Sequence, residues 1–525
     1  MHGAEVALLG LMAAVAVLSV LARAVEVPYP ILLVLGGLAI GFLPGLPNVE
    51  LPPELVLVLF LPPLLYHAAF FSSPRHLRAD LRAISLLAIG LVLVTMVAVA
   101  ITAHALIDGL PWSAAFVLGA IVSPTDPLAA TTIARRLGVG RRIVTLLEGE
   151  SLVNDATALV AYRLAVAATL GGSFVAWEAG LRFILSTTGG VVIGLVVGWL
   201  VADVRRRLED PTIEIVLSLV TGYLAYLPAE LLGVSGVLAA VTAGLYVGWR
   251  APALASAATR LLGFSFWEVF VYLLNAVLFI LVGLQLPGIV RGVTGRTAPE
   301  LVGLAAAVSA IVIGVRMAWQ FTVPYLIRAL DRRPSQVHRR AGARERCIVG
   351  WSGMRGAVSL AAALALPLAR NGQFPERSLI ILLTFAVILV TLVAQGLTLP
   401  ILIRRLGIRG DDAEEREELR ARLDATQAAL ARLEELAEED WTRSDTVDRL
   451  RGLYEYRHRR LSARAGNVED EGYEERSLAY QRLVRELLEA QRATIIRLRN
   501  QGEISNDVMH RVERDLDLED TRLEI

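Results

Sequence analysis

Long runs of apolar residues, separated by short polar segments that carry arginines, fill the first 405 positions of the chain. A helix needs about 20 mostly apolar residues to cross the hydrocarbon core of a bilayer, and its backbone must satisfy its own polar groups. This criterion predicts thirteen membrane-spanning helices, of which the second and third are short. Their approximate ranges are 4–22, 29–43, 55–71, 83–106, 112–134, 145–170, 180–202, 212–227, 231–249, 264–286, 299–328, 346–367 and 378–403. We therefore expect an all-α polytopic membrane protein.

The chain beyond residue 405 has a different pattern. Its clearest repeat places Leu419, Leu423, Thr426, Leu430, Leu433 and Ala437 in alternating steps of four and three. This spacing is typical of a short coiled-coil seam, and it fits an amphipathic helix that packs on a neighbour equally well. The sequence predicts two domains, a transmembrane domain over 1–405 and a helical regulatory or dimerising tail over 406–525.

Composition agrees with a membrane location, because 55% of the 525 residues are hydrophobic and only 19% are charged. A soluble protein contains about 25% charged residues, so we do not expect a soluble enzyme. The single cysteine, Cys347, excludes a disulfide framework, and the seven histidines lack the spacing of a metal site. We expect no cofactor and no nucleic-acid partner.

The net charge of zero combines two unlike parts, with 30 arginines against 21 acidic residues up to 405 and 21 against 30 beyond it. Up to 405, alternate predicted loops, such as the one with Arg205, Arg206 and Arg207, collect 22 of the arginines together with Arg23, Arg404 and Arg405. Short cytoplasmic loops hold an excess of positive residues, so we expect the tail in the cytoplasm and, after thirteen crossings, the N-terminus outside. The first apolar run lacks the preceding arginine of a secretory signal, so we expect it to remain as a span.

A charge inside a membrane span is costly and is functional by default. The candidates are four acids in two consecutive predicted spans and two arginines in late spans. They are Asp126, Glu148, Glu150, Asp155, Arg316 and Arg355. A different pattern occurs in the seventh span, where Gly190, Gly194 and Gly198 recur every four residues. That repeat is typical of close helix packing.

The fifth predicted span is interrupted at 123–127, where the sequence reads Ser-Pro-Thr-Asp-Pro. Pro124 and Pro127 each remove a helical hydrogen bond and free the carbonyl group four residues earlier. With the hydroxyl of Thr125 and the carboxylate of Asp126, they predict an unwound helix centre lined by oxygen atoms, which hard monovalent cations bind. The alternative is a proline kink in which Asp126 caps the next half-helix, and both can hold together.

Glu148, Ser151 and Asp155 share one face of the sixth span because they follow one another at helical spacing. If the span starts near 145, Asp155 lies about 15 Å along it, halfway through a hydrocarbon core of about 30 Å. A carboxylate at that depth avoids a bare charge by binding either a cation or a proton, and this competition couples the two. The alternative is an ion pair of Asp155 with Arg316, although Glu150, on the neighbouring face, fits that pair better. Glu148 is either a boundary charge or part of an entry funnel.

The twelfth span contains three glycines around Arg355, at 350, 353 and 356, and these weaken a helix. In an unwound stretch, Arg355 is able to donate to freed carbonyl groups or to hold a fixed positive charge. The fifth and twelfth spans run in opposite directions, so two broken helices indicate inverted repeats with a binding site between them near the midplane.

Four motifs, in their order along the chain, resemble the monovalent cation:proton antiporter family, sodium/proton exchanger branch. They are Leu-Pro-Pro-Leu-Leu-Tyr at 61–66, Ser-Pro-Thr-Asp-Pro at 123–127, Gly-Glu-Ser-Leu-Val-Asn-Asp at 149–155 and Trp-Ser-Gly-Met-Arg-Gly-Ala at 351–357. The resemblance covers nearly all of 1–405, and the tail is similar to those of bacterial members. It implies exchange of a monovalent cation for H⁺ across the plasma membrane. It further implies a homodimer, in which dimerisation helices hold a six-helix ion-translocating core that moves like an elevator.

The same resemblance implies roles for individual residues. The implied ion and proton site comprises Asp155, Asn154, Ser151, Thr125 and Asp126, with Na⁺ held by Asp155, Ser151 and Thr125. The implied structural ion pair comprises Glu150 and Arg316. The crossing helices are supported by Arg355, Pro124 and Pro127. Asparagine at 154, before the aspartate, matches the branch expected to exchange one cation for one proton without net charge transfer.

One position departs from the family pattern. His67 stands where many members have an acid, so a role of that acid in cation binding or pH gating is not carried over to this chain. Histidine titrates near neutrality and is able to sense pH, but a satisfied helix-face histidine is the simpler interpretation of His67. The alternative function is a cation channel, or a membrane sensor of cations or pH, that signals through the tail. Na⁺ is the expected cation, and Li⁺ and K⁺ are the alternatives, because spacing does not set the size of a cavity.

Overall fold

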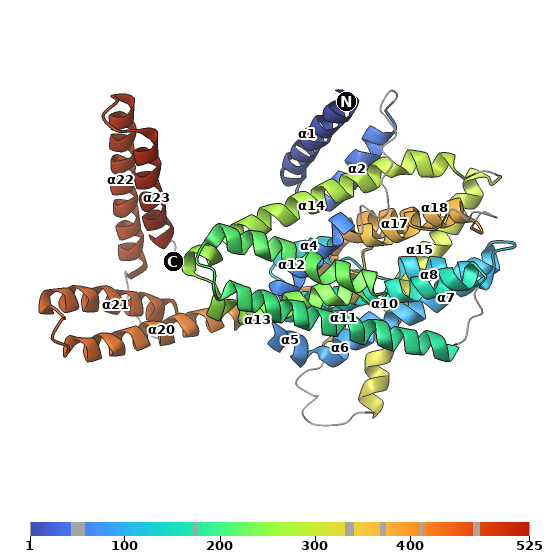
Figure 1. Ribbon diagram of the computed structural model, residues 1–525, viewed down its shortest axis with the longest axis horizontal. Coiled ribbons are helices and arrows are strands. Elements are labelled where there is room, and N and C mark those ends of the chain that lie inside the picture. Colours follow the sequence, from blue (N-terminus) through green and yellow to red (C-terminus); the bar gives the residue numbers. More distant parts are fainter. Residues whose placement is uncertain are drawn as a thin grey trace. The chain divides into compact units, whose positions relative to one another are not determined.

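The computed structural model describes residues 2–43, 58–171, 176–293, 295–330, 341–367, 374–408, 413–465 and 473–523. All regular elements in these ranges are helical, which confirms the all-α prediction (Figure 1). The chain divides into two compact units, Met1–Gly410 and Asp411–Ile525. The residues predicted to form the ion site all belong to the first unit.

The helices of the first unit have the following bounds in chain order. They are α1 (His2–Ala24), α2 (Tyr29–Gly41), α4 (Leu61–Phe70), α5 (Pro74–Ala79), α6 (Leu81–Ser85), the π-helical turn η1 (Leu86–Leu91), α7 (Val92–Leu106), α8 (Trp112–Val122), α9 (Leu128–Arg136), α10 (Arg141–Thr169), α11 (Ala176–Arg205), α12 (Pro211–Leu231), α13 (Gly236–Leu254), α14 (Ala257–Arg291), α15 (Ala298–Leu330), α16 (Ala343–Trp351), α17 (Ala357–Leu364), α18 (Arg377–Val390), the π-helical turn η3 (Thr391–Gln395) and α19 (Gly396–Leu406).

Seven helical segments in the described residues are long and apolar enough to cross a membrane. They are Leu81–Leu106, Gly180–Arg205, Pro211–Leu231, Gly236–Leu254, Ala257–Arg291, Ala298–Ile327 and Arg377–Leu406. Shorter apolar helices occupy Leu9–Ala24, Tyr29–Gly41 and Trp112–Val122, within the first, second and fifth predicted spans. The third predicted span begins outside the described residues, which resume at 58. The first unit is therefore a polytopic membrane domain.

Two helices are interrupted where proline or glycine weakens the helical backbone. Residues 123–127 separate α8 from α9, and residues 352–356 separate α16 from α17. The two breaks contact each other, because the amide of Asp126 donates to the carbonyl of Met354 (2.8 Å) and Arg355 Nε donates to the carbonyl of Val122 (3.0 Å). Each unwound segment thus supplies hydrogen-bond partners that the other has lost to its own break.

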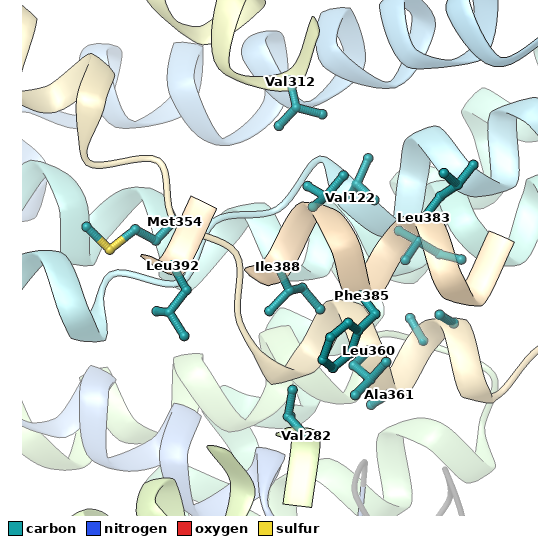
Figure 2. Packing of buried hydrophobic residues seen from close by; sticks show 14 of the residues in the cluster. Val122, Val282, Val312, Met354, Leu360, Ala361, Leu383, Phe385, Ile388 and Leu392 are labelled. Carbon is teal, nitrogen blue, oxygen red and sulfur yellow. The ribbon is translucent and has the colours of Figure 1, made fainter. Parts of the chain in front are cut away.

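An apolar cluster packs around these unwound segments (Figure 2). Val122 at the end of α8 and Met354 in the second break are fully buried, and the cluster continues through Leu360 of α17 and through Phe385 and Ile388 of α18. In a bilayer, close packing rather than transfer from water holds helices together. This cluster therefore fixes the position of a backbone that has few helical hydrogen bonds of its own.

Glycines allow α2 and α14 to approach until their backbones touch. A Cβ atom on Gly283 of α14 would overlap the carbonyl oxygen of Val34, and one on Gly37 of α2 would overlap the carbonyl oxygen of Ile280. Any larger residue at either position must push the two helices apart.

The same kind of contact joins α11 to α13. A Cβ atom on Gly194 would overlap the carbonyl oxygen of Ala239, and one on Gly190 would overlap that of Ser235. Gly198 follows the same stripe, where an added Cβ would lie 3.2 Å from the side chain of Tyr246. The packing role predicted for this glycine repeat is confirmed.

The second unit consists of two helical hairpins, α20 (Ala413–Ala437) with α21 (Ser444–Arg464) and α22 (Tyr473–Asn500) with α23 (Asn506–Leu523). All six residues of the predicted seam on α20 are half-buried. Arg451 of α21 donates to both carboxylate oxygens of Glu434 on α20, at 2.8 and 3.0 Å. Within one chain, α20 is therefore an amphipathic helix that packs on its neighbour, which was one of the two interpretations of the seam.

Substitution of Gly283 by alanine is expected to destabilise the membrane unit. The added methyl group overlaps the backbone of α2, and overpacking of this kind costs about 1–3 kcal/mol. The apparent unfolding temperature of the detergent-solubilised protein should fall. Gly288→Ala in the same helix is the matched control, because a Cβ atom there meets nothing within 4 Å. Equal unfolding temperatures for the two variants would contradict the close contact of α2 with α14.

Candidate functional site

Asp155 lies at the midpoint of α10, as the fifteenth of 29 residues. At 1.5 Å per residue, about 21 Å of helix lies on each side of it. The residue is 7% exposed, and no donor in the described part of the chain hydrogen-bonds its carboxylate. An isolated buried charge is costly, so this carboxylate requires a proton or a cation.

Glu150, five residues earlier in α10, has a quite different environment. Arg316 of α15 donates from Nη1 to Glu150 Oε1 (2.5 Å) and from Nη2 to Oε2 (2.9 Å). The guanidinium also donates to the carbonyl of Val349 in α16, at 3.1 and 3.3 Å. Both side chains of this ion pair are at most 2% exposed. The charge of Glu150 is therefore neutralised within the protein.

Thr125 and Asn154 extend the hydrogen bonds of the ion pair toward Asp155. The hydroxyl of Thr125, in the first break, donates to Glu150 Oε1 (2.9 Å). Asn154 Nδ2 donates to the hydroxyl and to the carbonyl of Thr125, at 2.9 and 3.2 Å. Asn154 Oδ1 is buried and has no hydrogen-bond partner. The network therefore orients the Asn154 amide so that its oxygen remains available to a ligand.

Asp126 and Ser123 satisfy backbone groups released by the first break. Asp126 Oδ1 accepts from the amide of Leu128, the first residue of α9 (2.9 Å). The hydroxyl of Ser123 donates to the carbonyl of Ala120, which Pro124 deprives of its helical donor (3.1 Å). Asp126 is half-buried. The structure thus shows the capping contact that the sequence offered as one interpretation of Asp126.

Arg355 lies in the second break and also contacts the end of α8 at the first break. Its amide donates to the hydroxyl of Thr391 in η3 (3.1 Å), and its guanidinium donates to the carbonyls of Val122 and Gly353. The side chain is 1% exposed. A Cβ atom on the adjacent Gly356 would overlap the carboxylate of Asp126, so this position admits only glycine. Arg355 therefore holds freed carbonyl groups, as its place in an unwound stretch predicted.

Two predicted residues of α10 lie at the edge of this arrangement. Ser151 is half-buried, and its hydroxyl makes no hydrogen bond within the described residues, so it is able to face a ligand. Glu148 pairs with Arg135 (2.6 Å), and the two side chains are 32% and 66% exposed. The contact places Glu148 at the boundary of the bundle.

His67 lies among aromatic rings rather than among acids. Its ring centroid is 4.7 Å from that of Phe71 and 5.4 Å from that of Trp267. The side chain is half-buried, which agrees with a histidine on a packed helix face. In the described residues, no ion pair involves it.

A second buried ion pair was missed by the sequence analysis. Arg205 was assigned to an arginine-rich loop, but its side chain is 4% exposed and donates to Glu214 of α12 (3.1 Å). Glu214 also accepts from the hydroxyl of Thr259 in α14 (3.1 Å). The assignment was wrong because Arg205 precedes two exposed arginines, and only its position as the last residue of α11 separates it from them.

The transmembrane sodium/hydrogen exchanger family matches residues 10–405. The chain belongs to that family. An uncharacterised Na⁺/H⁺ exchanger of Mycobacterium tuberculosis is 39% identical over 523 residues, which are 99% of this chain and 96% of the relative. The similarity to this exchanger therefore includes the tail.

Two further proteins extend the comparison of this exchanger-family chain. The Na⁺/H⁺ antiporter ApNhaP of Aphanothece halophytica is 36% identical over 412 residues, which cover 78% of this chain and 75% of the relative. The structure of the sodium proton antiporter MjNhaP1 from Methanocaldococcus jannaschii superposes with a TM-score of 0.57 at 20% identity, covering 77% of this chain and 99% of that one. This second likeness establishes the fold.

Removing one partner of the Glu150–Arg316 pair is expected to destabilise the exchanger strongly. Arg316→Met leaves a buried carboxylate without its cation, which costs about 3–5 kcal/mol, and Glu150→Gln leaves the opposite charge. The double variant should be less unstable than the sum of the two single changes. Thermal unfolding in detergent measures all three. Glu148→Gln, in the same helix, is the control and should change stability by less than about 1 kcal/mol, because its pair is exposed. Additive losses in the double variant would refute the pairing.

Proposed function

We propose that this chain exchanges one monovalent cation, Na⁺ in the first place, for one H⁺ across the plasma membrane, and that the two ions compete for Asp155. The proposal is supported by membership of the sodium/hydrogen exchanger family and by the names of its relatives, which are Na⁺/H⁺ exchangers and antiporters. The observation that supports it most is that the buried carboxylate of Asp155 has no hydrogen-bond donor among the described residues. Each neighbouring acid is engaged, since Glu150 is paired, Asp126 caps α9 and Glu148 lies at the exposed boundary.

Oxygen atoms around Asp155 supply a coordination set for a hard cation. Besides the carboxylate, the unpartnered Oδ1 of Asn154 and the hydroxyl of Ser151 have acceptor capacity. Thr125 gives its proton to Glu150 and accepts from Asn154, which leaves one lone pair on its hydroxyl oxygen. Hard cations take such carboxylate, amide and hydroxyl oxygens as ligands. We infer that Na⁺ binds Asp155, Asn154, Ser151 and Thr125.

A site in which one carboxylate, that of Asp155, binds the ions favours electroneutral exchange. Asn154 contributes an oxygen but no charge, so the site holds either one Na⁺ or one H⁺ against the charge of Asp155. Each transport cycle then moves one positive charge in each direction. The rate of such an exchanger does not depend on membrane potential, whereas the flux through a cation channel does.

Transport also requires that the site opens to one side of the membrane at a time. We infer thirteen crossings arranged as inverted repeats, with the N-terminus outside and the tail of 406–525 in the cytoplasm. We further infer a homodimer, in which the interrupted helices belong to a core that moves against dimerisation helices. The contact of two oppositely directed breaks near the middle of α10 supports this arrangement, because such pairs form midplane sites in transporters built from inverted repeats. Under an inward proton gradient, the cation is extruded.

Replacement of Asp155 by asparagine is expected to abolish exchange. In everted membrane vesicles acidified by respiration, Na⁺, Li⁺ or K⁺ added to the parent should dequench a pH-sensitive dye, and the cation that acts at the lowest concentration identifies the preferred one. Asp155→Asn should give no response above that of vesicles without the protein. Asp108→Asn makes the same chemical change at an exposed acid and should behave like the parent. A D155N variant that still exchanges protons for cations would remove Asp155 from its role.

Competition at one carboxylate predicts a simple pH dependence. Where the site is mostly protonated, the apparent KM for Na⁺ should rise about tenfold for each unit by which pH falls, because one proton must leave before one cation binds. The maximal rate at saturating Na⁺ should change much less. Initial rates in proteoliposomes, with equal pH on both sides and a tracer for Na⁺, measure both quantities. An apparent KM that does not change with pH would contradict a shared site.

A further inference from the structure

A cavity of about 240 Å³ lies at one end of the membrane unit. The first turns of α6, α10 and α16 and the last turns of α15 enclose it. None of the residues assigned above to the ion site lines this cavity. Its walls combine buried hydrogen-bond donors with apolar side chains, and neither the fold nor the exchange mechanism accounts for that combination.

Arg346, in the first turn of α16, is a buried cation in the wall of this cavity. The residue is 4% exposed. Its guanidinium donates to neutral groups, the hydroxyl of Tyr325 (3.0 Å) and the carbonyls of Gly342 (3.3 Å) and Gln320 (3.5 Å), and it lies 4.5 Å from the ring centroid of Tyr325. Among the described residues, no carboxylate pairs with it.

Two other buried arginines, Arg316 and Arg205, differ from Arg346 in this respect, because each has a carboxylate partner. Arg355 resembles Arg346, since it donates to carbonyl groups, but these carbonyls lie at the helix breaks. Glu345, the next residue to Arg346, is turned to the amide of Gly342 (3.0 Å) instead. A positive charge also opposes the dipole at the N-terminus of α16. The charge of Arg346 is therefore uncompensated at a position that favours an anion.

Gln320 of α15 presents a second donor to the same cavity. The residue is 5% exposed, and its Nε2 is buried without a hydrogen-bond partner. A buried donor left without an acceptor costs about 1–3 kcal/mol. Asp80, the acid in the cavity wall, is held by Arg142 at 3.0 Å. Among the described residues, the site thus holds a cation without a carboxylate partner, Arg346, and a buried donor without an acceptor, Gln320 Nε2.

Apart from Arg82 of α6, the remaining wall is apolar, with Leu87 of η1, Leu146 of α10, and Trp319 and Ile327 of α15. A ligand that matches the cavity therefore carries an anionic group with several acceptor oxygens next to a hydrocarbon part. The volume is below the range of about 300–1,000 Å³ found for pockets that enclose a drug-sized molecule. It accommodates a headgroup, with the hydrocarbon part outside. Basic pockets between membrane helices bind anionic lipid headgroups in this way.

We propose that this cavity binds the phosphate of an anionic phospholipid, with Arg346 and Gln320 as its ligands. The phosphate supplies the counter-charge that Arg346 lacks and the acceptor that Gln320 Nε2 lacks. The acyl chains leave along the apolar wall into the bilayer. Since the lipid contacts α10, α15 and α16 together, it stabilises their arrangement. This site is independent of whether Asp155 binds Na⁺.

The test uses the purified full-length protein in detergent, with native mass spectrometry and thermal unfolding as the two measurements. Phosphatidylglycerol, phosphatidylcholine with the same acyl chains, and glycerol phosphate without chains are titrated separately. We expect phosphatidylglycerol to be retained and to raise the unfolding temperature at concentrations about tenfold or more below those needed for phosphatidylcholine. Glycerol phosphate should have little effect.

Two variants assign the lipid to the cavity. Arg346→Gln removes the charge and should weaken binding of phosphatidylglycerol about ten- to hundredfold. Gln320→Glu gives Arg346 a carboxylate within the protein, so the variant should fold and lose its preference for the anionic lipid. Arg75→Gln, at an exposed arginine of α5, is the control for nonspecific attraction and should bind like the parent.

The outcomes separate the alternatives. Loss of the preference in Arg346→Gln and Gln320→Glu, with Arg75→Gln unchanged, supports the site. An equal preference in all variants shows attraction to the surface at large and overturns it. A stabilising effect of glycerol phosphate equal to that of the lipid shows that the cavity takes a soluble phosphate, and it overturns the lipid assignment. If Arg346→Gln does not fold, Gln320→Glu alone decides between these results.

Discussion

The guanidinium of Arg316 brings three separate stretches of the chain to one point. It lies on α15, it pairs with Glu150 of α10, and it donates to the carbonyl of Val349 in α16. Through Glu150 the contact reaches Thr125 in the first break, and through Thr125 it reaches Asn154. A buried charge without its partner is strongly destabilising, so these helices cannot separate at this point without a large loss of free energy. The geometry of the site depends on this one ion pair.

The ion pair also determines which acid remains available. Glu150 and Asp155 lie five residues apart on the same helix, and both are buried. The first is paired with Arg316, and the second has no hydrogen-bond donor among the residues that the structure describes. A transporter needs this difference, because an acid that is paired within the protein releases neither a proton nor a cation. Replacing the pair by apolar residues could retain stability, but it would remove the hydrogen bonds that orient Asn154 toward the ligand.

Sequence reasoning located the elements of this site because each depends on local chemistry. Pro124, Pro127 and the glycines near Arg355 interrupt helices by their own backbone properties. Helical spacing places Glu150 and Asp155 on different faces, and that difference indicated which of them pairs with Arg316. Contacts between distant segments could not be read in this way. The unpartnered Oδ1 of Asn154 depends on a hydrogen bond to Thr125, 29 residues earlier, and nothing in the local sequence specifies it.

Arg205 and Arg346 both differ from the expectation that arginine-rich stretches are exposed. Both residues belong to arginine-rich stretches, whose composition indicates an exposed loop, yet each lies at a helix end inside the bundle. Arg205 is compensated by Glu214, whereas no carboxylate in the described part of the chain pairs with Arg346.

The cavity beside Arg346 and the proposed ion site lie on the same helices. Val349 lines the cavity, and its carbonyl accepts from Arg316. Arg142, in the same wall, lies 13 residues before Asp155 on α10, or about 20 Å along a rigid helix. A ligand there cannot contact an ion at Asp155. The proposed lipid would instead contact α10, α15 and α16, which are the three helices that Arg316 joins.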